Sequence, residues 1–260
     1  MIKKITWYIL LLTSVVITFI FLSGLGSSLA ITTASKKTAE ISPSKAIPAV
    51  LDPNYYNILV LGDSLAKGTG DENGKGFPGY FTDSFKSKIS KEIKLTNIAV
   101  NGDVSSGLIK IIEAPETIAY IKSSKIIFIS IGGNEITKLA RTDIATATTE
   151  AKNIEDNYLA NLKEIYKTVR TNNSSCMVIF IGLYNPFGKE VTADKINFLN
   201  EWNYQSEHVI STDSNSIFVP TYDLFKFNLD NYLTVDNFHP NSAGYQAISN
   251  RILEALKNYK

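Results

Sequence analysis

The sequence predicts an α/β domain built as three layers, α/β/α, around a mainly parallel five-stranded sheet. Apolar runs of strand length recur along residues 53–260, and stretches with helical amphipathic spacing lie between several of them. Strands that alternate with helices form βαβ units, whose crossovers cover both faces of a parallel sheet. Most of the runs are almost continuously apolar, as expected for strands that are buried on both faces.

The individual elements follow from local spacing. Four of the five apolar runs consist almost entirely of Val, Ile, Leu and Phe. The first predicted helix carries Phe81, Phe85 and Ile89 at four-residue intervals, which places them on one face. We find no internal repeat, so one domain is expected. The predicted strands are residues 58–61, 98–100 with Leu95 leading in, 126–131, 177–183 and 217–219, and the predicted helices are residues 77–93, 153–171 and 248–256.

The amino terminus has the pattern of an export signal. Lys3 and Lys4 precede an apolar stretch over residues 5–22, and positive charge followed by an apolar core directs a chain to the membrane. This core approaches the length of a membrane span, so we favour a retained anchor, although Ser-Leu-Ala at 28–30 resembles a cleavage site. The domain should therefore lie outside the cytoplasmic membrane, either anchored or secreted. The expected segments are a signal peptide or membrane anchor over residues 1–30, a linker over 31–52 and the folded domain over 53–260.

Composition excludes several classes of protein. With 26 basic and 25 acidic residues the formal net charge is +1, so no basic field for nucleic acid is expected. Cys176 is the only cysteine, which rules out a disulfide within the chain and predicts a buried, inert thiol in its apolar run. The only histidines are His208 and His239. A zinc site of nitrogen and sulfur ligands is therefore not expected, and an imidazole base has two candidates.

Polar residues follow the predicted strands at the end where parallel sheets bind ligands. GDSL (62–65) follows the first strand, NGD (101–103) the second and GGNE (132–135) the third. DNFHP (236–240) lies past the fifth strand, and YNPFG (184–188) after the fourth is expected to be a substrate-side loop. Each block alone fits a turn, a helix cap or a loop hydrogen bond. Their common placement at strand ends favours a shared site.

In these blocks the sequence resembles the SGNH hydrolases, also called the GDSL family of esterases and lipases. The resemblance covers about residues 56–250, and LGDSLAKGTG and SIGGNEI look like bacterial membrane-tethered members. It implies the SGNH-hydrolase fold, a flavodoxin-like α/β/α arrangement. Glu135 departs from the family, which usually has Asp after the block Asn. The residues that match the family's blocks are Ser64 (nucleophile), Gly102 (glycine), Asn134 (asparagine), and Asp236 with His239 (terminal pair).

The chemistry of these residue types agrees with serine catalysis. A serine hydroxyl is a weak nucleophile until a neighbouring base takes its proton. His239 would be that base, and Asp236 would fix the tautomer of its imidazole. The backbone N–H groups of Ser64 and Gly102 and the amide of Asn134 would stabilise the oxyanion. Glycine suits position 102 if the backbone must approach the substrate closely without a Cβ.

Two other residues receive plainer roles. Asp63 is expected to shape the turn before the nucleophile, and His208 to be an exposed residue at a helix end. A Gly-x-Ser-x-Gly elbow is excluded, because that fold places its nucleophile in the middle of the domain and its acid far from the histidine.

The sequence thus predicts an exported serine esterase that needs no metal or organic cofactor. Candidate substrates are short-chain esters, O-acetyl groups on surface glycans and lysophospholipids. No nucleic-acid partner is expected, and the membrane is a partner only if the N-terminal segment is retained. The alternatives are a catalytically silent glycan- or lipid-binding domain and an acyltransferase on the same fold. The acyl and alcohol portions of the substrate and the oligomeric state stay open.

Overall fold

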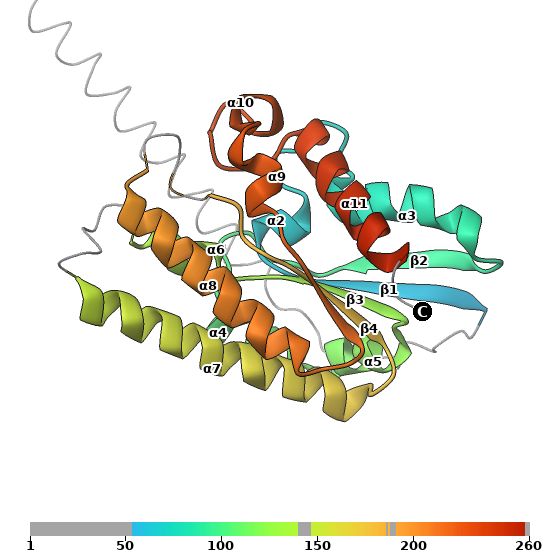
Figure 1. Ribbon diagram of the computed structural model, residues 1–260. Coiled ribbons are helices and arrows are strands. Elements are labelled where there is room, and N and C mark those ends of the chain that lie inside the picture. Colours follow the sequence, from blue (N-terminus) through green and yellow to red (C-terminus); the bar gives the residue numbers. More distant parts are fainter. Residues whose placement is uncertain (1–53, 140–146, 186, 188–190, 258–260) are drawn as a thin grey trace, which may run out of the picture. The chain divides into compact units, whose positions relative to one another are not determined.

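The computed structural model describes residues 54–139, 147–185, 187 and 191–257. These residues form a five-stranded sheet in which every neighbouring pair of strands is parallel, in the order β2-β1-β3-β4-β5 (Figure 1). The α/β class and the five-stranded parallel sheet are therefore confirmed. The strands are β1 (Tyr55–Gly62), β2 (Glu92–Asn97), β3 (Ile126–Ser130), β4 (Met177–Ile181) and β5 (Ser216–Val219).

The anchor or signal peptide predicted over residues 1–30 and the linker over 31–52 lie outside the described residues. Across the ranges that are described, no helix has both the length and the apolarity to cross a membrane.

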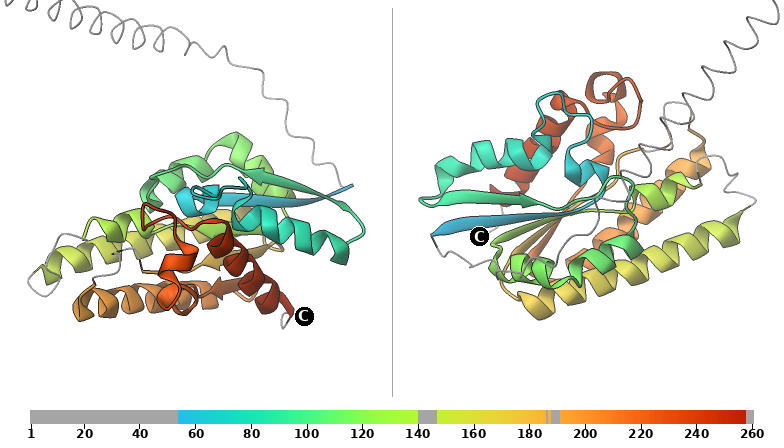
Figure 2. Two further views of the ribbon diagram at one scale, coloured as in Figure 1. Left: turned by 90° about the horizontal axis from the view of Figure 1, so that it is seen from above. Right: turned by 180° about the vertical axis from the view of Figure 1, so that it is seen from behind.

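Helices cover both faces of the sheet (Figures 1 and 2). The helices α3 and α11 pack on one face, whereas α4, α5, α7 and α8 lie on the other. The helices are α2 (Ser64–Lys67), α3 (Gly76–Phe85), α4 (Ser105–Ile112), α5 (Pro115–Ser123), α6 (Gly133–Thr137), α7 (Thr148–Asn172), α8 (Ala193–Ser211), α9 (Tyr222–Lys226), α10 (Leu229–Tyr232) and α11 (Ser242–Lys257), with a 3₁₀ turn, η1, at Lys86–Lys88.

The core forms two clusters because successive residues of a strand point to opposite faces. In β1, Leu59 and Leu61 pack with residues of α4, α7 and α8. Ile58 and Val60 pack with residues of α3 and α11. This burial on both faces is the reason that the central strands are continuous apolar runs.

The strand predicted over residues 98–100 is misplaced, since β2 ends at Asn97. β2 is an edge strand that pairs with β1, and its residues are either exposed or half-buried. It therefore lacks the continuous apolar run that marks the central strands. Ile98 and Val100 still donate backbone hydrogen bonds to the last residues of β1. The segment after β2 therefore follows β1 as a loop.

The helix predicted over residues 77–93 is too long. α3 ends at Phe85, and the chain becomes extended at Ile89 after the 3₁₀ turn. Glu92 then pairs with Tyr55, so the sheet pairing overrides the four-residue apolar spacing.

The other two predicted helices, residues 153–171 and 248–256, fall within the longer α7 and α11 and are confirmed. The helices α4, α5 and α8 are additional to the prediction. β3 and β4 end before the limits predicted for them, at Ser130 and Ile181.

Candidate active site

The turn after β1 places Ser64 at the carboxyl edge of the sheet. Gly62 has a φ of +128°, and a Cβ there would lie 1.8 Å from the carbonyl oxygen of Ser130, so the turn requires glycine. The Asp63 N–H donates to the same carbonyl at 3.0 Å. The Asp63 side chain accepts from the N–H of Leu65 at 3.0 Å and caps α2. Ser64 is thereby fixed as the first residue of α2, and it is buried.

A short loop before α11 holds Asp236 and His239 together. Asp236 Oδ1 accepts the backbone N–H groups of Phe238 at 2.8 Å and His239 at 2.9 Å, and the hydroxyl of Thr234 at 2.7 Å. Asp236 Oδ2 lies 2.7 Å from His239 Nδ1. Partial burial acts to raise the pKa of Asp236, but the hydrogen bonds from Thr234, His239 and Phe238 outweigh it and hold that pKa well below its ordinary value. Asp236 is therefore a carboxylate at neutral pH.

The fold brings this loop to the nucleophile turn. His239 Nε2 lies 3.0 Å from Ser64 Oγ, although the two residues are 175 positions apart in the chain. An ionised Asp236 can only accept, so Nδ1 carries the proton and Nε2 presents its lone pair to the Ser64 hydroxyl. A continuous chain of hydrogen bonds thus joins carboxylate, imidazole and hydroxyl, as a serine nucleophile requires.

Asn134 and the Gly102 loop are also linked. Asn134 lies in α6, and its Nδ2 donates to the carbonyl oxygen of Asp103 at 2.8 Å. An amide nitrogen carries two hydrogens, and this bond uses one of them. Asn134 lines a cavity together with Ser64, whereas Gly102 is not among the described residues that line it. The structure therefore places Asn134 beside Ser64. Gly102 lies in the adjoining loop, outside the described lining of the cavity.

The close approach to the substrate expected at Gly102 stays a prediction, and the backbone gives a further reason for glycine. A Cβ at Gly102 would meet no described atom within 4 Å, so the surrounding protein does not require glycine. Its φ of +76° does, because side-chain-bearing residues rarely adopt this left-handed conformation.

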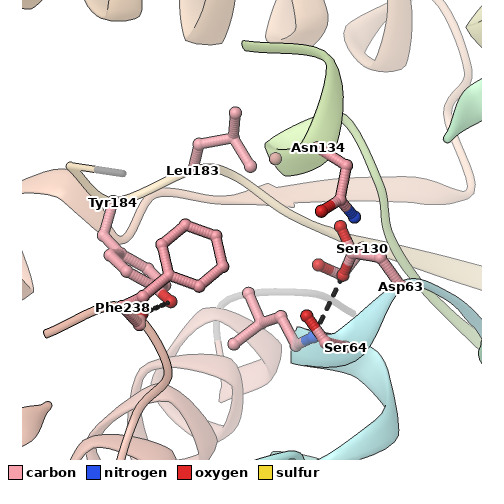
Figure 3. Close-up of a pocket in the computed structure, with 9 residues that line it drawn as sticks. Asp63, Ser64, Ser130, Asn134, Leu183, Tyr184 and Phe238 are labelled. Carbon is pink, nitrogen blue, oxygen red and sulfur yellow. Dashed lines mark hydrogen bonds between the residues drawn. The ribbon is translucent and has the colours of Figure 1, made fainter. Parts of the chain in front are cut away.

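The cavity beside Ser64 has a volume of about 30 Å³. Figure 3 shows Leu183, Tyr184 and Phe238 on one side of it and Asn134, Ser130, Asp63 and Ser64 on the other. Leu183 and Tyr184 belong to the loop after β4, so Tyr184 of the expected substrate-side loop lines the cavity beside Ser64. Pro186 and Gly188 lie outside the described residues. The described residues that line the cavity are Asp63, Ser64, Leu65, Ser130, Gly133, Asn134, Leu183, Tyr184 and Phe238.

Two buried carboxyl groups, those of Asp63 and Glu135, lie near Ser64. Burial raises the pKa of Asp63 to about 7; the hydrogen bond from the Leu65 N–H opposes the rise, and the charge of Glu135 adds to it. Asp63 shapes the turn as predicted, and it also lines the cavity. Glu135 Oε1 accepts the N–H of Ser105 at 2.5 Å, so the residue that departs from the family pattern connects α6 to the start of α4.

His208 and Cys176 occupy the positions that the sequence predicts for them. His208 is exposed in the last turn of α8. Cys176 is buried, and this burial raises the pKa of its thiol despite the neighbouring Arg170. Neither residue is among those that line the cavity.

Sequence reasoning missed the segment Thr69–Gly70, which contacts two of the four blocks. The Thr69 hydroxyl donates to Asn101 Oδ1 at 2.8 Å, next to Gly102. Gly70 has a φ of +94°, and a Cβ there would lie 2.9 Å from His239 Cβ and 2.7 Å from the carbonyl oxygen of Pro240. The two residues end the stretch LGDSLAKGTG, which resembles the family, but the resemblance gave them no role. Gly70 therefore packs against the loop that carries Asp236 and His239, called the histidine loop below.

Comparisons with known proteins show the family and the fold of the chain. A family model described as GDSL-like Lipase/Acylhydrolase matches residues 58–252. The chain is 32% identical over 208 residues to YpmR, an uncharacterized protein of Bacillus subtilis (strain 168), covering 77% of this chain and 81% of YpmR. It is 27% identical over 204 residues to the spore germination lipase LipC of Bacillus licheniformis, covering 75% of this chain and 93% of LipC. The crystal structure of the lipase Lip_vut3 from a goat rumen metagenome matches with a TM-score of 0.66 and 23% identity, covering 76% of this chain and 96% of that chain, which shows a shared fold.

Proposed function

Because the chain belongs to the family of GDSL-like lipases and acylhydrolases, which are serine carboxylic ester hydrolases, we propose that it cleaves its ester in two steps through an acyl-enzyme on Ser64. The observation that carries this proposal is the chain of hydrogen bonds from Asp236 through His239 to Ser64, with distances of 2.7 and 3.0 Å. A nucleophile within hydrogen-bond reach of a base, itself oriented by a third group, is the arrangement that serine catalysis needs.

In the first step Ser64 Oγ attacks the carbonyl carbon of the ester while its proton passes to His239 Nε2. The C–O bond to the alcohol then breaks, and His239 returns the proton to the departing alcohol oxygen. Asp236 keeps the imidazole in the required tautomer and stabilises its positive charge while the proton is held. The products of this step are the free alcohol and an ester of Ser64.

In the second step water replaces the alcohol. His239 takes a proton from the water molecule, whose oxygen attacks the acyl carbon, and the bond to Ser64 Oγ breaks as the proton passes to that oxygen. The free acid leaves and the enzyme is restored. Proton and electron pairs balance over the two steps without a metal or an organic cofactor.

Each attack places negative charge on the carbonyl oxygen, which then needs hydrogen-bond donors. We assign this role to the backbone N–H groups of Ser64 and Gly102 and to the side chain of Asn134. The link from Asn134 to the carbonyl of Asp103 supports a common position for the last two donors. Donors that are fixed before the reaction stabilise the charge without reorganisation.

We also propose that the enzyme acts outside the cytoplasmic membrane. The support is the amino-terminal pattern of Lys3 and Lys4 before the apolar residues 5–22. Esters of the cell envelope, among them O-acetylated glycans and lysophospholipids, would then be within its reach.

The experiment that tests the function is hydrolysis of p-nitrophenyl esters by the full-length protein and its Ser64→Ala variant. We expect turnover by the wild type, and loss of at least about 10³-fold in kcat in the variant with its thermal unfolding unchanged. Equal turnover by both proteins would remove Ser64 from the mechanism. If neither hydrolyses any ester and a fluorophosphonate probe does not label Ser64, the silent binding domain becomes the correct interpretation.

A further inference from the structure

The described residues beside Ser64 leave little room for an acyl group. The volume of the cavity is about 30 Å³, whereas a single water molecule needs roughly 10–15 Å³ by the same kind of measure. We infer that this cavity receives the acyl portion of the ester and limits it to an acetyl group or one of similar size. This inference rests on the proposed function and specifies its substrate class.

The position of the base indicates which part of the ester enters the cavity. The departing alcohol oxygen must lie beside His239 Nε2 to receive its proton. The cavity is lined by Ser64 and Asn134, and His239 is not among its described lining residues. An ester whose carbonyl carbon is at Ser64 Oγ and whose alcohol faces His239 therefore directs its acyl group into the cavity.

The walls of the cavity are held in place by their own contacts. The backbone N–H and carbonyl of Leu183 are both bound by the side-chain amide of Asn203, at 2.9 and 2.8 Å. The Tyr184 hydroxyl donates to the carbonyl oxygen of Phe238 at 2.5 Å, and its ring stacks on Phe225 with centroids 4.4 Å apart. A longer acyl chain would have to displace these walls or leave the cavity through its open side.

Gly133 and Leu183 are the positions where the size of the cavity can be changed without touching the triad. A Cβ at Gly133 would lie 3.5 Å from Asp63 Oδ2 and 3.8 Å from Leu183 Cδ2, which are ordinary contact distances. Gly133→Ala therefore fits the structure while it fills part of the cavity. Leu183→Ala removes the opposing side chain and enlarges the cavity.

The test is the chain-length profile of kcat/KM for p-nitrophenyl acetate, butyrate and octanoate with the full-length protein. In the wild type we expect kcat/KM for octanoate to be at least about tenfold below that for acetate, because each surplus methylene must displace packed protein. Leu183→Ala should reduce this discrimination by about tenfold or more, and Gly133→Ala should increase it. Leu162→Ala is the matched control, since Leu162 is a buried leucine of α7 that is not among the lining residues; it should keep the wild-type profile.

The outcomes distinguish failure of the small acyl cavity from failure of the proposed esterase function. A wild type that prefers octanoate, or a profile that neither Leu183→Ala nor Gly133→Ala alters, overturns the small acyl cavity and leaves the esterase intact. Absence of any Ser64-dependent hydrolysis overturns the proposed function, and the acyl assignment with it. Should Leu183→Ala fail to fold, Leu183→Val gives the same direction of change with a smaller loss of packing.

Discussion

At the scale of single residues, the orientation of His239 depends on Asp236. The Asp236 carboxylate binds both the backbone and the ring of His239, so it fixes the loop and the tautomer together. An amide at this position can still accept from the backbone N–H groups, but its nitrogen can only donate. The carboxylate charge therefore matters for the chemistry more than for the shape of the loop.

We predict that Asp236→Asn lowers kcat by about 10²–10⁴-fold with a much smaller effect on stability. The amide removes the negative charge that favours the imidazolium and allows the wrong tautomer. Steady-state kinetics and thermal unfolding of the purified variant measure the two effects. A kcat within a few fold of the wild type would show that Asp236 does not orient the base.

In the proposed mechanism, Asn134 donates a hydrogen bond that stabilises the negative charge on the carbonyl oxygen. Replacing Asn134 by Ala removes one donor, so kcat should fall by about 10²–10³-fold while KM changes little. Asn173→Ala serves as the control for loss of a half-buried asparagine, because its amide donates to the carbonyl oxygens of Ile121 and Ser124 and it is not among the residues that line the cavity. A larger change in KM than in kcat for Asn134→Ala would indicate a substrate-binding role in place of an oxyanion role.

At the scale of elements, the loop from α2 to α3 supports the histidine loop. Gly70 lies against His239 and Pro240, whereas Gly74 in the same loop has a φ of +65° and no described atom near a built Cβ. Both positions carry the backbone penalty for a side chain at positive φ. Only Gly70 adds a collision with His239, the base of the proposed mechanism.

Gly70→Ala should therefore reduce kcat by about tenfold or more, through displacement of His239 from Ser64. Gly74→Ala should lose only about 1 kcal/mol of stability and retain the wild-type kcat. The rate at which a fluorophosphonate labels Ser64 reports the same displacement independently of substrate binding. If the two alanine variants have equal kcat, the loop does not position the base.

At the scale of the whole molecule, Asp63 couples folding to pH. The pKa of Asp63 is about 7 in the folded protein against 3.8 for the ordinary carboxyl. Between these values the folded state keeps a proton that the unfolded chain has lost, so this group makes the free energy of unfolding fall as pH rises from about 4 to about 7. Asp236 has the opposite sign: its lowered pKa contributes stability that is lost as pH falls below about 4.

We predict that Asp63→Asn flattens the decline in stability between about pH 4 and pH 7, because the amide does not titrate. Urea unfolding at several pH values within this window measures the slope for wild type and variant. Asp83→Asn, which removes an exposed carboxylate of α3, should keep the wild-type slope. An unchanged slope in Asp63→Asn would mean that Asp63 is ionised throughout the window.

The sheet and the order of the blocks could be predicted because they rest on local patterns. Burial on both faces makes β1, β3 and β4 continuous apolar runs, and the block residues follow strand ends directly. β2 was predicted at the wrong residues because an edge strand with exposed residues has no continuous apolar run. The short helices α4 and α5 have too few turns for a clear period.

The cavity could not be predicted from the sequence for a different reason. Its described lining residues come from four separate parts of the chain, and Gly133 and Leu183 carry no chemistry that marks them. They meet only because β1, β3 and β4 are neighbours in the sheet. The support from Gly70 likewise arises from a tertiary contact with His239.

The most direct test of the account is to trap the covalent intermediate. The full-length protein is mixed with p-nitrophenyl acetate, quenched in acid within the first turnovers and digested, and its peptides are analysed by mass spectrometry. The account predicts one acetyl group on Ser64, which disappears when the reaction is chased without substrate and never forms in Ser64→Ala. Hydrolysis that proceeds at the wild-type rate with no acetyl group on Ser64 would contradict it.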